Sequence, residues 1–264
     1  MMIDLHCHII PGIDDGAPTL EASLAMAEAA AKDGITIIVA TPHIITGLYE
    51  TTKQAILEGV ERLNQIISQE GLPVEILPGS EVHIEPDLPG RIQDQEVLTI
   101  NNTGRYLLVE LPSAFVPDYT ADVLYQIQLL GITPIIAHPE RNASLMRNHA
   151  ALKEMVVRGV LTQITSASVT GYFGRRVRRT ALELIAEGLG HMIATDGHAE
   201  KGRTPQMREA FQIIEKYWGT DIAGQMTRDI PLAVCKGTDV VLPVINERKK
   251  SPWKYGLTSK WKLF

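Results

Sequence analysis

Seven short apolar runs recur along the chain, and each of them ends in polar or ionisable residues. The runs span residues 3–8, 35–43, 74–83, 106–112, 132–141, 160–166 and 191–198. Their length and their content of β-branched residues are typical of buried strands. Because helical patterns separate most of the runs, the chain is predicted to form a parallel sheet with helices packed outside it.

The segments between the runs predict helices at 19–32, 51–70, 118–130, 149–158, 175–187 and 204–218. In 51–70, apolar residues recur with the period of a helix, and the pattern stops at Gly71. Seven strand-and-helix units without a Gly-x-Gly-x-x-Gly turn favour a (β/α)7 barrel over a doubly wound sheet. Residues 84–104 interrupt the alternation, and their prolines and the pair Asn101-Asn102 predict a loop and a hairpin.

The net charge of the 264 residues is −6, and it is unevenly distributed. Six of the 25 basic residues but only one of the 31 acidic residues lie after position 246, so residues 1–246 carry −11. An acidic body disfavours a nucleic-acid partner, because phosphate backbones select basic surfaces. We therefore expect a domain at 1–246 and a separate basic, aromatic tail at 247–264.

Two cysteines, Cys7 and Cys235, are too few for a disulfide framework or a cysteine-based zinc site. No apolar run approaches the roughly 18 residues that span a bilayer, and the first residues do not resemble a signal peptide. The expected compartment is the reducing cytoplasm.

The ionisable residues at the ends of the runs are the candidates for metal binding and catalysis. His6 and His8 lie two apart on a strand, so both imidazoles face one side. Five of the eight histidines occur at such run ends, and the carboxyl ends of parallel barrel strands gather at one mouth. Histidines and carboxylates without thiolates suit Mn²⁺, Fe or Zn²⁺ rather than a Ca²⁺ cage. The alternative for any single histidine is an ordinary core or surface residue, and we interpret His83, His149 and His191 in that way.

The ordered set of motifs resembles the polymerase-and-histidinol-phosphatase (PHP) superfamily over residues 1 to about 240. The motifs are His6-Cys-His8, Asp14-Asp15-Gly16, Thr41-Pro-His43, Gly79-Ser-Glu81, Glu110, His138-Pro-Glu-Arg141, Thr195-Asp196-Gly-His198 and Gly202-Arg203. Within it, Asp-Asp-Gly-Ala, Thr170-Gly-Tyr-Phe-Gly174 and Gly202-Arg-Thr-Pro205 are similar to bacterial manganese-dependent protein-tyrosine phosphatases of capsular and exopolysaccharide gene clusters. The resemblance implies a distorted TIM-like (β/α)7 barrel with a metal site at the carboxyl ends of its strands.

The resemblance also implies three divalent ions, most readily Mn²⁺, with Fe and Zn²⁺ as alternatives. The first would be held by His6, His8, Glu81 and Asp196, the second by Glu81, Glu110 and His138, and the third by Asp15, His43 and His198. Asp15 is preferred over its neighbour Asp14 because it aligns with the second Asp of the family's pair. Arg141 and Arg203 would bind phosphoryl oxygens as forks of donors.

The implied activity is hydrolysis of phosphotyrosine by a metal-activated hydroxide. A cysteine phosphatase needs an Arg six positions after its nucleophile, whereas Ile13 and Val241 occupy those positions. The alternatives are a histidinol-phosphate phosphatase and a non-catalytic, metal-stabilised module. The resemblance suggests a membrane-associated tyrosine kinase of polysaccharide synthesis as the substrate, and the tail at 247–264 leaves a peripheral membrane contact open. A homo-oligomer is also left open.

Overall fold

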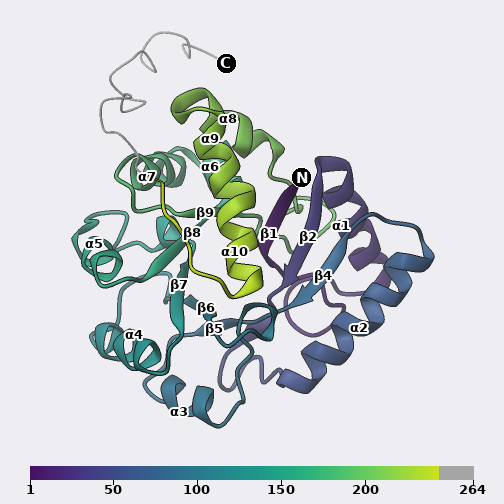
Figure 1. Ribbon diagram of the computed structural model, residues 1–264, viewed down its shortest axis with the longest axis horizontal. Helices are drawn as coiled ribbons and strands as arrows, with labels where there is room; N and C mark the ends of the chain where they lie inside the picture. The colour runs from purple at the N-terminus through teal and green to yellow at the C-terminus, as the bar shows by residue number, and fades with distance from the viewer. Residues whose placement is uncertain (244–264) are drawn as a thin grey trace.

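The computed structural model describes residues 1–243, so the tail expected at 247–264 lies outside the described residues. Every paired strand is parallel, and the strands lie in two sheets of order β1-β2-β4 and β3-β5-β6-β7-β8-β9. Their bounds are β1 Met2–Cys7, β2 Ile35–Ala40, β3 His43–Ile44, β4 Glu75–Pro78, β5 Glu81–His83, β6 Tyr106–Glu110, β7 Thr133–Ala137, β8 Leu161–Thr165 and β9 Met192–Ala194. Figure 1 shows helices around the outside of these strands.

All seven predicted runs contain strands, but the second and third contain two short strands each. The first of these runs is interrupted by Pro42, which has no backbone N–H to donate, and the second by Gly79-Ser80. The chain continues from β2 into β3 and from β4 into β5, which joins the two sheets. The strands therefore follow one another in the order predicted for a seven-stranded barrel.

The ring closes between β1 and β9 by isolated contacts rather than by a ladder. Cys7 pairs with Gly197 in a single parallel bridge. The backbone N–H of His8 donates to the carbonyl of Gly197 at 2.8 Å, and that of Asp196 donates to the carbonyl of His6 at 2.7 Å. The expected distorted, barrel-like α/β fold is confirmed, and the backbones of His6, His8 and Asp196, three of the predicted metal ligands, form part of its irregular seam.

The six predicted helices are present as α1 Leu20–Asp33, α2 Lys53–Gln69, α4 Thr120–Leu129, α5 Ala150–Val157, α7 Arg175–Ala186 and α8 Arg208–Trp218. Thr19 and Thr52 cap α1 and α2, each accepting a hydrogen bond from the backbone three residues on. The sequence pattern does not predict three further helices, which are α6 Ser166–Thr170, α9 Thr220–Gly224 and α10 Ile230–Lys236. No helix in residues 1–243 is long and apolar enough to cross a membrane.

The hairpin predicted within 84–104 is wrong. This segment forms the short helix α3 Leu88–Gln93 and the 3-10 turn η1 Ile100–Asn102. Pro89 lies in the first turn of α3, where a missing N–H costs nothing. Asn101 and Asn102 take positive φ values of 49° and 51° inside the 3-10 turn instead of connecting two strands.

Two cores hold the fold together and leave one end of the barrel polar. The larger core fills the space between strands and helices. The smaller lies inside the barrel, where residues such as Ile3, Leu5 and Met192 meet Ile230 and Val234 of α10. Figure 1 shows α10 crossing the centre of the ring. Because α10 closes the amino ends of the strands, the carboxyl ends are left for the ionisable side chains.

A change of register in β1 places both apolar and polar residues on the inner face. Ile3 and Leu5 belong to the inner core, and Cys7 belongs to the outer core. The pairing with β2 shifts between Asp4 and Cys7, so the alternation of side chains restarts at His6. His6 and His8 therefore point to the same side as Leu5, but at the open end of the barrel.

Buried His191 should make the protein less stable in acid. Burial lowers the pKa of His191 to about 4, below its ordinary 6.5, and its Nδ1 accepts the Thr162 N–H at 3.0 Å. The unfolded state takes up the proton first as the pH falls below 6.5, so stability present above that pH is lost toward pH 4. We expect His191 to account for about 2 kcal/mol of lost unfolding free energy at pH 5. His191→Asn, whose amide oxygen can replace Nδ1, should show a correspondingly smaller difference between urea unfolding at pH 8 and pH 5. Equal pH dependence in the two proteins would exclude this role.

Candidate metal centre

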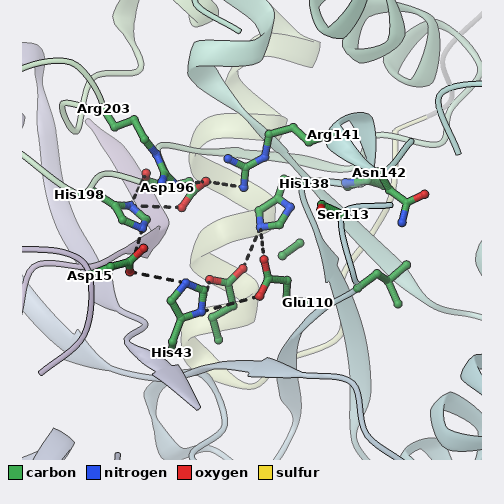
Figure 2. Close-up of a pocket in the computed structure, with 14 residues that line it drawn as sticks. Asp15, His43, Glu110, Ser113, His138, Arg141, Asn142, Asp196, His198 and Arg203 are labelled. Atoms are coloured by element: carbon green, nitrogen blue, oxygen red, sulfur yellow. Dashed lines mark hydrogen bonds and ion pairs between the residues drawn. The ribbon is translucent and has the colours of Figure 1, made fainter. Parts of the chain in front are cut away.

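The nine residues expected to bind metal gather at the carboxyl ends of the strands, beside a cavity of about 310 Å³ (Figure 2). The cavity is lined by Asp15, His43, Glu81, Glu110, Leu111, Ser113, Ala137, His138, Pro139, Arg141, Asn142, Asp196, His198 and Arg203. His6 and His8 lie directly behind this lining and are fully buried. The strand ends thus bring together residues that are up to 192 positions apart.

The deepest group consists of His6, His8, Glu81 and Asp196. His6 Nε2 lies 3.1 Å from Glu81 Oε2 and 3.3 Å from Asp196 Oδ1, and His8 Nε2 lies 3.2 Å from Glu81 Oε2. These separations suit ligand atoms that share one ion at about 2.0–2.2 Å. The set is the one expected for the first metal.

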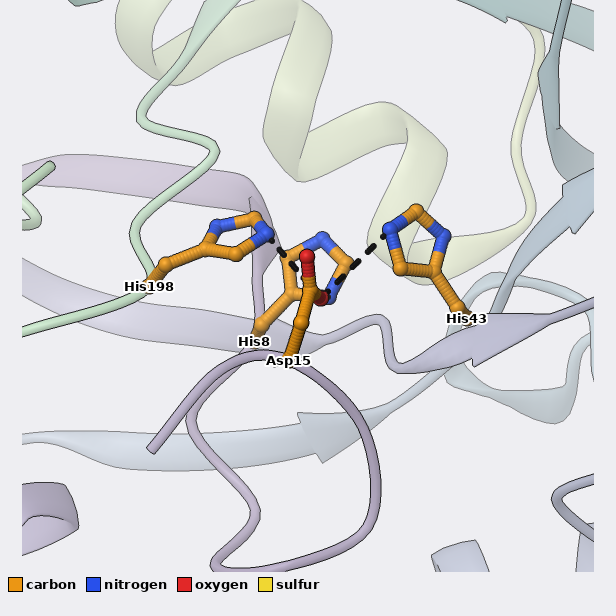
Figure 3. A group of neighbouring side chains, drawn as sticks. All are labelled: His8, Asp15, His43 and His198. Atoms are coloured by element: carbon orange, nitrogen blue, oxygen red, sulfur yellow. Dashed lines mark ion pairs between the residues drawn. The ribbon is translucent and has the colours of Figure 1, made fainter. Parts of the chain in front are cut away.

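The group on the outer side contains Asp15, His43 and His198, with His8 beside them (Figure 3). Asp15 Oδ1 lies 3.4 Å from His198 Nε2 and 3.6 Å from His43 Nε2. The structure therefore brings together the three residues expected for the third metal.

The remaining group contains Glu81, Glu110 and two histidines. His138 Nε2 lies 2.9 Å from Glu81 Oε1 and 3.6 Å from Glu110 Oε1, so the set expected for the second metal is together. His43 Nδ1 also lies 3.2 Å from Glu81 Oε2, and His43 joins the two glutamates in a compact group. One ring nitrogen of His43 thus faces this group and the other faces Asp15.

The buried atoms of the cluster fit a requirement for cations. Within the described residues, Glu81 Oε2, Asp196 Oδ1 and His43 Nδ1 are buried without a hydrogen-bond partner. Burial alone would raise the pKa of Glu81, but His6, His138 and His8 hold it well below its usual range. A buried carboxylate oxygen without a hydrogen bond is costly unless further positive charge faces it. Divalent cations would supply that charge.

Asp14 and Asp15 have different surroundings, which bears on which of them binds metal. Asp14 Oδ2 lies 2.6 Å from His8 Nδ1 and accepts the His43 N–H at 3.0 Å, while its Oδ1 accepts the Gly16 N–H at 2.9 Å. Both carboxylate oxygens of Asp14 therefore already have hydrogen-bond partners within the protein. Asp15 points its carboxylate into the cavity instead (Figures 2 and 3).

Two of the cavity residues have strained backbones. His138 has φ 33° and Asp196 has φ 53°, in the left-handed region that glycine adopts most easily. His138 follows β7 and Asp196 follows β9, and the side chain of each residue points into the cavity. Backbone strain of this kind is concentrated at functional sites, where surrounding structure maintains it.

Arg141 and Arg203 contact the same carboxylate oxygen. Arg141 Nη2 lies 2.6 Å from Asp196 Oδ2, and Arg203 Nη2 lies 2.5 Å from it. Figure 2 shows Asp196 between the two guanidinium groups, which line one wall of the cavity. Two cations held beside the ligand cluster are well placed to bind an anion that also contacts the metals.

Comparison with known proteins identifies the family. The family described as capsular polysaccharide synthesis, CpsB/CapC, matches residues 2–236. The tyrosine-protein phosphatase YwqE of Bacillus subtilis is 38% identical over 231 residues, covering 88% of this chain and 91% of YwqE. This chain belongs to the CpsB/CapC family. Another relative, the tyrosine-protein phosphatase CpsB of Streptococcus pneumoniae, is 32% identical over 237 residues, covering 87% and 96% of the two chains.

Solved structures agree with the family assignment. A chain from the crystal structures of YwqE from Bacillus subtilis and CpsB from Streptococcus pneumoniae, described as metal-dependent tyrosine phosphatases, matches with a TM-score of 0.88. It is 35% identical, and the match covers 92% of this chain and 97% of that one. Histidinol phosphate phosphatase from Lactococcus lactis, at 14% identity and a TM-score of 0.54, shares the fold alone.

Sequence reasoning missed the residues of this CpsB/CapC site that support the ligands from outside. Gln163 Oε1 lies 2.9 Å from His6 Nδ1, and Asp4 accepts the Thr195 N–H at 2.8 Å below the cluster. Tyr49 stacks on His43 with ring centroids 5.6 Å apart. Asp4 stands between Ile3 and Leu5, and Gln163 lies within the run 160–166, and a polar residue inside such a run is the one signal that could have indicated them.

Replacing Asp14 should weaken metal binding without removing a ligand. Asp14→Asn keeps the shape but disturbs the contact that orients His8, and loss of such a partner typically costs 10–100-fold in affinity. Asp15→Asn should cost more than Asp14→Asn, because it removes an expected ligand. Titration of both variants with Mn²⁺ measures this, with exposed Asp94→Asn as the control. A larger loss in Asp14→Asn would reverse the two assignments.

Proposed function

We propose that this protein is a metal-dependent protein-tyrosine phosphatase that holds three divalent ions, most readily Mn²⁺, with Fe and Zn²⁺ as alternatives. The observation that carries the proposal is that the nine expected ligands gather at one cavity, which seven of them line together with two arginines. The family's named relatives are tyrosine-protein phosphatases, and the matching crystal structures are of metal-dependent enzymes.

The charges of the cavity suit a phosphomonoester. Four carboxylates, Asp15, Glu81, Glu110 and Asp196, would offset most of the charge of three divalent ions and leave a net positive site. When bound, such ions lower the pKa of water and neutralise developing charge on phosphoryl oxygens. Arg141 and Arg203 would release part of their contact with Asp196 and bind the phosphoryl group from one side.

A cysteine nucleophile does not fit this site. Cys7 is fully buried, with its side chain in the outer core, and Cys235 is packed in the inner core. Burial raises the pKa of the Cys7 thiol well above its usual range and that of Cys235 to about 12. Neither thiol can supply the exposed thiolate that a covalent phosphatase needs.

Two other functions make different predictions. A non-catalytic module would be expected to lack ligands, whereas seven of the nine expected residues line the cavity and His6 and His8 lie behind it. A histidinol-phosphate phosphatase could share the ligands, but the likeness to such an enzyme extends to the fold alone.

The deciding experiment compares substrates under identical metal loading. The Mn²⁺-loaded protein is assayed on a phosphotyrosine peptide, the same peptide with phosphoserine, and histidinol phosphate. The proposal expects kcat/KM to be highest for the phosphotyrosine peptide. Preference for histidinol phosphate would support the alternative, and the absence of turnover on all three would support a non-catalytic module.

The natural substrate that we propose is a membrane-associated tyrosine kinase of polysaccharide synthesis, encountered in the cytoplasm. The family's link to capsular polysaccharide synthesis supports the pathway, and the basic, aromatic composition of 247–264 suits an acidic partner or anionic lipid.

Deletion of 247–264 should separate docking from chemistry. Hydrolysis of a small aryl phosphate is expected to stay near that of the full chain, because the described cavity contains no residue beyond Arg203. Action on the membrane-bound kinase should fall, and the deficit should be greatest at low salt, where the charge of the tail is least screened. Parallel loss of both activities, or unfolding of the shortened protein, would assign the tail to the fold.

A further inference from the structure

The turn between α6 and α7 places two aromatic side chains beside the arginines of the cavity. Gly171 and Gly174 flank Tyr172 and Phe173 with φ values of 100° and 90°. The Tyr172 N–H donates to the carbonyl of Ala167 at 2.9 Å, and the Gly174 N–H donates to that of Gly171 at 2.9 Å. The two glycines permit the tight turn that carries both rings.

Phe173 contacts one of the two arginines. The Cζ atom of Arg141 lies 5.2 Å from the centre of the Phe173 ring, within the range of a cation–π interaction. The other side of this guanidinium donates to Asp196. Arg141 is thus held between an aromatic ring and a carboxylate, which limits the orientations of its fork.

Tyr172 packs against the turn that carries the other arginine. Its ring meets Phe173 edge to face, with centroids 5.1 Å apart and an interplanar angle of 84°. Its hydroxyl oxygen lies 3.2 Å from the position a Cβ would take on Gly202, which has φ 88° and precedes Arg203. A side chain at position 202 would therefore meet this hydroxyl.

We propose that Tyr172 and Phe173 are positioning residues that set the two arginines as one unit for binding the phosphoryl group. The proposal rests on the phosphatase function above. Phe173 acts through Arg141, Tyr172 acts through the Gly202-Arg203 turn, and the edge-to-face contact makes the two positions depend on each other. The two rings act on the arginines, and only the arginines contact an expected ligand, Asp196, so metal should stay bound when either ring is changed.

Double-mutant cycles test this, with inorganic phosphate as the probe and calorimetry of the Mn²⁺-loaded protein as the readout. Phe173→Leu keeps a similar volume without the π face and should weaken phosphate binding about tenfold. In an Arg141→Ala background the same change should have almost no effect, because the group it positions is gone. Phe173→Tyr should restore the affinity. Phe173→Met replaces the leucine variant if that protein melts early.

Tyr172→Ala gives the matched cycle with Arg203→Ala, and Tyr172→Phe should lose affinity in the same cycle because it removes the hydroxyl that meets Gly202. Each aromatic change should couple most strongly to its own arginine. Affinity equal to that of the unmodified protein, equal losses with and without the arginine, or a loss of bound Mn²⁺ would each overturn the proposal. If phosphate binds with the expected coupling but no phosphotyrosine is hydrolysed, the phosphatase function fails while the positioning role stands.

Discussion

Glu81→Gln is expected to lose bound metal and nearly all turnover, by more than the roughly 100-fold that loss of an outer partner costs. Glu81 is fully buried, and its carboxylate lies within 3.2 Å of a nitrogen of each of His6, His8, His43 and His138. The amide has the same shape but carries no charge to offset that of the expected ions. One substitution therefore disturbs two of the three expected metal positions.

The same chemical change at an exposed position provides the control for Glu81. Glu75 begins β4 with its side chain in solvent, so Glu75→Gln should leave metal content and turnover unchanged. Elemental analysis and turnover of a phosphotyrosine peptide measure both proteins. A Glu81→Gln protein that keeps its metals and its rate would remove Glu81 from the centre of the site.

Arg141→Ala and Arg203→Ala are each expected to lower turnover by about 10²–10³-fold while the metals stay bound. Both guanidinium groups line the cavity and contact Asp196 Oδ2, but neither belongs to the histidine and carboxylate groups that could hold an ion. The loss should therefore arise from missing donors to phosphoryl oxygens.

Arg147→Ala is the matched control, because Arg147 is exposed on the same connection as Arg141. Elemental analysis of all three variants separates loss of metal from loss of donors. Wild-type turnover in both Arg141→Ala and Arg203→Ala would assign the two arginines a purely structural role.

The positions of the strands and of the site could be predicted because apolar runs and strand ends are local features of the sequence. Each run that ends in an ionisable residue places that residue at the mouth of a parallel barrel, whatever the details of the loops. This is why His138 and Asp196 could be expected in one cavity although β7 and β9 are separated by 54 residues.

What could not be predicted depends on contacts between distant segments. The pairing of β1 with β2 sets the register shift that turns His6 and His8 inward. The position of the short helix α10 depends on its packing inside the barrel. The interpretation of 84–104 from its prolines is wrong because a proline breaks the interior of a helix but is favourable in its first turn. Pro89 lies in the first turn of α3. Gln163 contacts His6 and Asp4 accepts the Thr195 N–H, and the partner that each of them meets is set by the fold and not by the local sequence.

The dependence of turnover on bound metal tests the central claim most directly. The protein is stripped of metal by chelation, and hydrolysis of a phosphotyrosine peptide is followed as Mn²⁺ is returned. Nine expected ligands beside two arginines, with both thiols buried, predict no turnover in the stripped protein. It also predicts a rate that rises with Mn²⁺ and saturates near three equivalents. Full turnover by the stripped protein would contradict the account.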